Sequence, residues 1–108
     1  MVEHIVLFRW SPGVSEQAVA ETLQALEGMK TKVPGIVDLN CGEDFSGRSD
    51  GYHVCLRVRF TDRAALQAYE PHEAHQHVVQ NFIRPICEKV LAFDFETAPL
   101  GNGTNAPE

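Results

Sequence analysis

The sequence predicts an α+β fold in which helices cover one face of a four-stranded antiparallel sheet. Four segments rich in β-forming residues alternate with two segments that have the apolar spacing of helices. Their order along the chain is β-α-β-β-α-β, which is the ferredoxin-like arrangement. With 108 residues, of which 44% are hydrophobic, the chain has room for one compact domain, which we place at residues 1–96.

The first strand and the first helix have the clearest boundaries. Residues 3–10 alternate and are rich in β-formers, and Pro12 stops the strand because proline cannot donate to a sheet. Ser15 is placed to cap a helix, and Pro34-Gly35 ends that segment. The apolar stripe of this helix consists of Val19, Leu23, Leu26 and Met29.

The second half of the domain consists of a hairpin, a broken helix and a last strand. Residues 36–44 and 52–60 are expected to pair as a hairpin across a polar loop. Thr61 or Asp62 can cap a short helical piece that runs to Tyr69, and Pro71 separates it from a second piece at 72–82. A further proline ends the second piece. Residues 86–96 then form the fourth strand.

Composition and charge exclude several classes of function. A formal net charge of -6 at pH 7 repels phosphate backbones and anionic lipid headgroups, so we expect neither a nucleic-acid partner nor a membrane partner. The first residues do not resemble a signal segment, which favours a cytoplasmic protein. The three cysteines are widely spaced and fit reduced thiols better than disulfides or a zinc site. The tail at 97–108, rich in proline and glycine, is expected to be disordered.

Strand parity predicts a second subunit. One parity of the first and third strands supplies an apolar set that faces the helices. The opposite parity is also apolar, at Ile5, Leu7, Leu91, Phe93 and Phe95. Leaving these side chains in water would forgo on the order of several kcal/mol, at ~25 cal/mol per Å2. We therefore expect a homodimer through the open face of the sheet, a dimeric α+β barrel of two sheets face to face with the helices outside.

The histidines are the candidate site residues. The chain has five, and His72, His75 and His77 cluster after Pro71. On a helix, His72 and His75 would share a face, whereas His77 would point away. No third donor completes a metal-binding pattern, so we expect neither a metal nor another cofactor. His4 has the parity of the helix-facing set and should point toward the last helical segment.

Several short motifs, taken in order, resemble the Dabb family of stress-responsive barrel proteins. They are His4-Ile5-Val6-Leu7-Phe8, Gly51-Tyr52-His53, Tyr69 followed by His72 and His75, and Glu88-Lys89-Val90-Leu91-Ala92-Phe93-Asp94. The similarity extends over about residues 2–95 and implies the same dimeric barrel that strand parity predicts. It also implies kinship with a plant polyketide cyclase, a member that closes an aromatic ring without metal or cofactor.

The resemblance gives the histidine cluster a chemical role. In a cyclase-like site, His75 would act as general base, and Tyr69 would orient the substrate or donate to an enolate oxygen. Histidine, with an unperturbed pKa of ~6.5, is able to remove a proton flanked by carbonyls. The ligand would be a small, largely apolar carbonyl or aromatic compound. The residues expected to bind it are His4, Val6, Phe8, His72 and Val78.

Several functions remain open at this point. An enzyme of this kind would be a cofactor-free lyase, cyclase or isomerase. The alternatives are a subunit that binds a small molecule without turnover, a structural stress protein, and a cofactor-independent monooxygenase acting on electron-rich aromatics. An open cavity beside His4, Tyr69 and His75 would favour an enzyme or a binding protein, whereas a filled core would favour a structural role.

Overall fold

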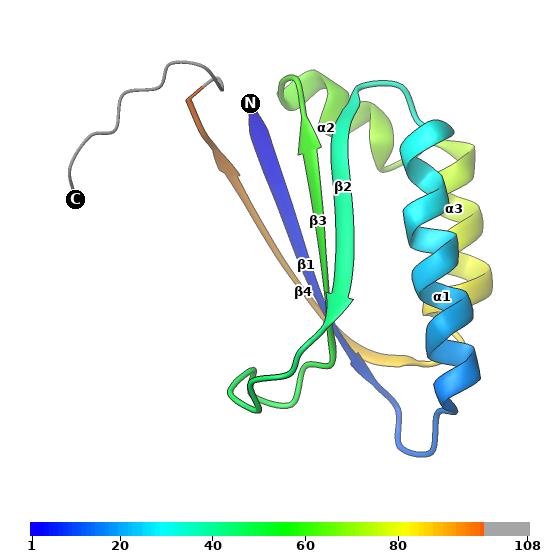
Figure 1. The fold of residues 1–108 in the computed structure, drawn as a ribbon. Coiled ribbons are helices and arrows are strands. Elements are labelled where there is room, and N and C mark those ends of the chain that lie inside the picture. The colour runs from blue at the N-terminus through cyan, green and yellow to red at the C-terminus, as the bar shows by residue number, and fades with distance from the viewer. Residues whose placement is uncertain (99–108) are drawn as a thin grey trace.

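The computed structural model describes residues 1–98 and has two layers, a sheet and a set of helices that cover one of its faces (Figure 1). The elements are β1 (Val2–Trp10), α1 (Glu16–Gly28), the 3-10 turn η1 (Met29–Thr31), β2 (Ile36–Glu43), β3 (Val54–Phe60), α2 (Arg63–Tyr69), α3 (Glu73–Val78), the π-helix η2 (Val79–Ile83) and β4 (Cys87–Glu96). The strands form one sheet in the order β2-β3-β1-β4, with antiparallel neighbours. The predicted ferredoxin-like α+β fold is confirmed. The disordered tail expected at 97–108 lies, from residue 99 onward, outside the described residues.

The central strand β1 has two faces with different surroundings. It pairs with β3 on one side and with β4 on the other, so that His4 stands opposite Val58 and Asp94. The parity that includes Val6 and Phe8 faces the helices and is buried, as predicted, together with the matching parity of β3. Burial of this set, at ~25 cal/mol per Å2, is a main source of the stability of the domain.

Side chains cap the first two helices as predicted. The Ser15 hydroxyl accepts a hydrogen bond from the Ala18 N–H at 3.1 Å, and the Asp62 carboxylate accepts one from the Ala65 N–H at 2.9 Å. Each cap satisfies a donor that the first turn of a helix leaves without a partner. The two helices therefore begin where the sequence indicates.

The last helical segment differs from the single piece predicted at 72–82. Helix α3 ends after Val78, and the chain continues as the π-helix η2, in which the Arg84 N–H donates to the Val79 carbonyl at 2.9 Å. A π-turn is wider than an α-turn. Val78, Val79 and Ile83 consequently all reach the space between this segment and the sheet.

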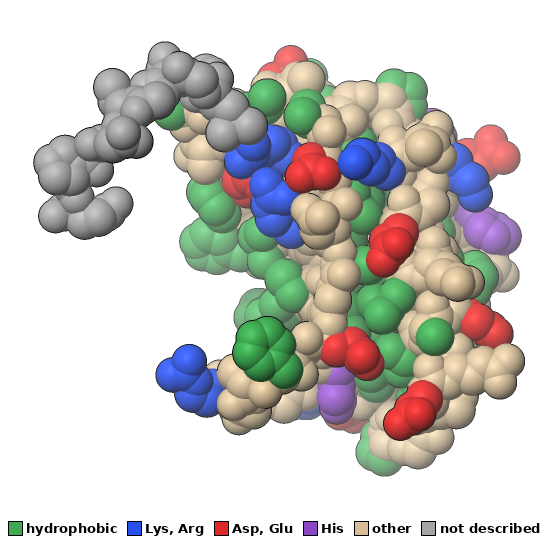
Figure 2. Space-filling model, in the orientation of Figure 1, with side chains coloured by type: hydrophobic (Ala, Val, Ile, Leu, Met, Phe, Trp, Pro, Cys, Tyr) green, Lys and Arg blue, Asp and Glu red, His purple; other side chains and the backbone are tan. Residues whose placement is uncertain are grey.

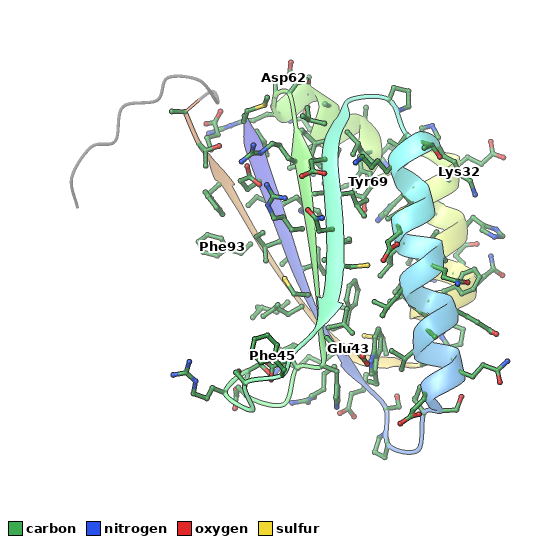
Figure 3. All side chains as sticks on the ribbon, viewed as in Figure 1. Lys32, Glu43, Phe45, Asp62, Tyr69 and Phe93 are labelled. Carbon is green, nitrogen blue, oxygen red and sulfur yellow. The ribbon has the colours of Figure 1, made fainter. Side chains whose placement is uncertain are left out.

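No described element covers the face of the sheet opposite the helices. Its large exposed side chains are Leu91 (50% exposed), Phe93 (66%) and Phe95 (42%). Phe93 points away from the helices in Figure 3, and hydrophobic side chains gather along this side in Figure 2. Beside them, the buried Glu3 forms ion pairs with Arg57 and Arg59. This face, which we call the open face, therefore has an apolar part on β4 and a network of ion pairs on β1 and β3.

Candidate active site

A cavity lies between the sheet and the last helical segment. Its volume is about 230 Å3. It is lined by six of the seven predicted site residues: His4, Val6, Phe8, Tyr69, His75 and Val78. Ile83 from the π-helix and Ala92 from β4 complete the largely apolar wall. The structure thus brings the predicted base, the predicted phenol and most of the predicted apolar lining around one space, and Figure 3 shows Tyr69 between the two layers.

His72, the seventh predicted residue, lies outside this cavity. It is the N-cap of α3, and its Nδ1 accepts the Ala74 N–H at 3.0 Å. It borders a separate hollow on the α1 side of α3, together with His77 and Lys32. The helical face that His72 was expected to share with His75 does not form, because the helix starts one residue after His72.

His75 has a ring orientation that suits a base. Its Nδ1 lies 2.8 Å from the backbone carbonyl of Glu70, and a carbonyl only accepts hydrogen bonds, so Nδ1 carries a proton. In the neutral ring, Nε2 then has the free lone pair. That carbonyl is available to His75 because α2 ends at Tyr69 and the Ala74 N–H, its partner in a continuous helix, donates to His72 Nδ1 instead. The Gln76 side-chain amide also donates to it, at 2.8 Å.

The pKa of His75 is lowered, chiefly because burial disfavours the charged ring. The hydrogen bond to the Glu70 carbonyl acts in the opposite direction, and the neighbouring His4 adds to the lowering. The net effect favours the neutral imidazole, which is the form that accepts a proton.

The Tyr69 ring contacts the rings of His4, Phe60 and His75 and is 1% exposed. Its ring centroid is 4.3 Å from that of His75 and 5.8 Å from that of His4. Burial raises the pKa of the phenol above its ordinary value, so the hydroxyl keeps its proton. That hydroxyl lies 3.9 Å from the Met29 sulfur, a weak acceptor. The proton of Tyr69 is therefore available to a better acceptor.

His4 is bound to a carboxylate that the sequence analysis did not assign to the site. Its Nδ1 is hydrogen-bonded to the carboxylate of Asp94, the residue opposite it on β4. The carboxylate holds the imidazole in a fixed orientation, with Nδ1 protonated and Nε2 as the second nitrogen. Asp94 also borders a more polar hollow of about 340 Å3, which shares Glu70 with the apolar cavity.

The sequence shows on which face of the last strand Asp94 lies, but its pairing with His4 depends on the register between β1 and β4. Asp94 shares the parity of Val90 and Ala92, both of which line the cavity, and is the next residue of that parity along the strand. Parity alone places a carboxylate on the helix side. The pairing of residues 4 and 94, which makes it a partner of the histidine, is visible only in the folded sheet.

The other candidate donors lie elsewhere. His53 Nδ1 accepts the Trp10 N–H at 3.0 Å, and His77 is paired with Asn81. Among residues 1–98, no group of three or more histidine, cysteine, aspartate or glutamate side chains could hold a metal ion. The cavity therefore offers acid and base groups on an apolar wall.

These features define a class of protein, the ferredoxin-like α+β domain with an apolar cavity and a histidine–tyrosine cluster between its layers. The chain belongs to the family of the stress responsive A/B barrel domain, Dabb, whose model matches residues 2–97. No helix within residues 1–98 is long and apolar enough to span a membrane.

Comparison with known proteins agrees with the family. The chain is 22% identical over 95 residues to a stress-response A/B barrel domain-containing protein of Arabidopsis thaliana, a match that covers 87% of this chain and 36% of that protein. The chain thus spans about a third of the length of this relative.

Solved structures show the same fold. A crystal structure of another Arabidopsis thaliana protein superimposes with a TM-score of 0.82 at 22% identity, covering 93% of this chain and 98% of that one. The hydroxynitrile lyase from Passiflora edulis has a TM-score of 0.78 at 21% identity, covering 91% of this chain and 96% of that one. Several further neighbours, from Thermobifida fusca, Bacteroides fragilis and a Jannaschia species, are described as dimeric ferredoxin-like proteins.

Proposed function

We propose that this domain binds a small, largely apolar carbonyl or aromatic compound in the cavity and that His75 acts on it as a general base without a cofactor. The observation that carries the proposal is the hydrogen bond from His75 Nδ1 to the Glu70 carbonyl. It leaves the basic nitrogen, Nε2, without a proton in a half-buried ring whose pKa is already lowered.

The reaction that this arrangement supports is proton transfer next to a carbonyl. His75 Nε2 takes a proton from the carbon beside the carbonyl, the C–H electron pair moves toward the carbonyl carbon, and negative charge develops on the oxygen. The Tyr69 hydroxyl donates a hydrogen bond to that oxygen. The enolate then either recovers the proton, which gives exchange or isomerisation, or attacks a second carbonyl, which closes a ring.

His4 and Asp94 form the second part of the proposed site. The Asp94 carboxylate orients the His4 ring beside the cavity, where the ring would contact the developing oxyanion while His75 accepts the proton. The polar hollow that Asp94 borders would accommodate a hydroxyl or carbonyl group of the ligand, and the apolar cavity its hydrocarbon part.

The hydroxynitrile lyase of similar fold supports an enzyme over a purely structural protein. A hydroxynitrile is the adduct of cyanide and a carbonyl compound, so its substrate belongs to the carbonyl chemistry proposed here.

Proton exchange tests the proposal without knowledge of the natural substrate. We expect the protein to accelerate exchange of the methyl protons of acetophenone in D2O, followed by NMR, and His75→Asn to lower that rate by on the order of 100-fold or more. Asparagine keeps a donor for the Glu70 carbonyl but lacks a base. Asp94→Asn should lower the rate by about 10-fold, the loss of one hydrogen bond to a charged group.

His77→Asn is the matched control, because His77 lies on the same helix outside the cavity. Its exchange rate should equal that of the wild type. An unchanged rate in His75→Asn would show that His75 is not the base. Binding of acetophenone without exchange in the wild type would identify a binding subunit and contradict catalysis.

We also propose that the domain is a homodimer formed through the open face. The exposed Leu91, Phe93 and Phe95 support this assembly, because a second copy would remove their side chains from water. Several neighbours of the same fold are described as dimeric. A mass in solution of one 12.0 kDa chain would contradict the proposal.

A further inference from the structure

The loop between β2 and β3 holds a fully exposed aromatic side chain. Phe45 is 100% exposed, whereas Phe8 and Phe60 are buried. Figure 3 shows Phe45 on the side of the sheet away from the helices, the side to which Phe93 points. A phenylalanine in water forgoes the transfer free energy that burial would give, and such side chains commonly serve as interface anchors.

The loop that carries Phe45 is ordered by its own hydrogen bonds. The Asp44 carboxylate accepts the Ser46 hydroxyl at 2.7 Å and the Gly47 N–H at 2.9 Å. These bonds lower the pKa of Asp44. The Ser49 hydroxyl donates to the Tyr52 carbonyl at 2.6 Å. Because the loop is already fixed, docking of Phe45 against another surface would cost little conformational entropy.

The loop is continuous with the open face. A hollow of about 270 Å3 lies where they meet, and it is lined by Phe45 together with Leu7 of β1 and Cys55 of β3. Leu7 stands opposite Leu91 in the sheet, so the apolar surface runs from β4 across β1 to the loop. Whatever covers the open face therefore meets Phe45 as well.

The charges of the open face favour a second copy of this chain as the occupant. The ion network consists of Glu3, Asp38, Arg57 and Arg59, two acidic and two basic side chains that pair with one another. Their charges cancel, although the chain as a whole has a formal net charge of -6. The networks of two copies therefore meet without net like-charge repulsion, whereas a partner of strong charge would gain no attraction from them.

We propose that Phe45 of each protomer anchors the dimer by packing against the open face of the partner. The inference rests on the proposed dimer and adds to it a contact from outside the sheet. By two-fold symmetry the anchor is used twice, once in each direction.

The dimer dissociation constant of Phe45→Ser tests this inference. We expect it to rise by at least about 100-fold, because the substitution removes two buried rings per dimer, each worth about 10-fold or more. Sedimentation over a dilution series measures the constant. The rate of subunit exchange between differently labelled dimers measures the same loss when the dimer is too tight to dissociate, and it should rise accordingly.

Ala20→Ser is the control, because Ala20 is an exposed apolar residue on α1, which covers the other face of the sheet (Figure 1). It should leave the dissociation constant unchanged. Circular dichroism confirms folding, and Phe45→Leu should retain most of the affinity. A wild-type monomer would overturn the dimer itself. A wild-type dimer whose constant and exchange rate are unaffected by Phe45→Ser would overturn the anchor alone and leave Phe45 to a different partner.

Discussion

The protonation of His75 links the chemistry of the site to the stability of the fold. Burial lowers the pKa of His75 in the folded protein, whereas the unfolded chain has the ordinary value of ~6.5. Between the two values, the unfolded state binds more protons than the folded state. The stability that the neutral ring contributes is therefore present above pH ~6.5 and is lost as the pH falls through the folded pKa.

We expect NMR titration of His75 to give a pKa below ~6.5, and the acid limb of the exchange rate to follow the same value. The wild type should also lose stability relative to His75→Asn between about pH 7 and about pH 5, measured by urea unfolding at each pH. His75→Asn identifies the resonance, because its signal disappears in that variant. A pKa above that of free histidine would show that the charged form is favoured and would exclude the proposed base.

At the scale of elements, the turn before β2 depends on a glycine. Gly35 has φ +90°, and a Cβ built on it would lie 2.8 Å from the Cβ of Ala65 at the start of α2. This close approach fixes the edge of the sheet against the second helix. Gly13 has a similar φ of +84°, but no heavy atom lies within 4 Å of its would-be Cβ.

Comparing the two glycines separates the cost of the clash with Ala65 from the cost of a positive φ, because only Gly35 lies close to another residue. Gly13→Ala should cost about 1 to 2 kcal/mol, the strain of an alanine at positive φ. Gly35→Ala should cost about 1 to 3 kcal/mol more, because it adds a clash in a packed region. Urea unfolding of both variants measures the difference. Equal losses would show that Ala65 moves away freely.

Elements differ in how well local patterns predict them. The caps at Ser15 and Asp62 and the alternation in β1 depend on neighbouring residues, so the sequence predicts them directly. The π-helix at Val79–Ile83 was not predicted, because one wide turn barely changes the spacing of apolar residues in so short a segment. His72 was misplaced for a related reason, since its role as cap depends on which residue starts α3.

Contacts between distant residues limit the prediction of the site in the same way. Tyr69, His75 and Val78 are close in sequence, and a helical segment brings them together. His4 on β1 and Asp94 on the edge strand β4 are paired across two neighbouring strands, and no local sequence pattern predicts that register. The site is therefore predictable where one segment builds it and hidden where two distant strands meet.

At the scale of the whole molecule, assembly should control stability. If folding and dimerisation are coupled, the thermal midpoint rises with the concentration of the chain. Phe93→Asp, which places a charge on the open face, should abolish this dependence and give a monomer. Ala20→Asp adds the same charge on α1, which covers the other face of the sheet (Figure 1), and should behave as the wild type. A midpoint independent of concentration in the wild type would contradict the coupling.

The alternation of β1 has a consequence for how this protein can change. His4, Val6 and Phe8 line the ligand cavity, and Ile5 and Leu7, between them, have the parity of the open face. One strand thus separates the proposed ligand from the proposed partner by the thickness of a single sheet, and substitutions in either set of side chains would affect one of the two. New ligand specificities should therefore arise at Ile83 or Ala92, on the far walls of the cavity. Insertions or deletions within β1 would exchange its two faces and remove both properties together.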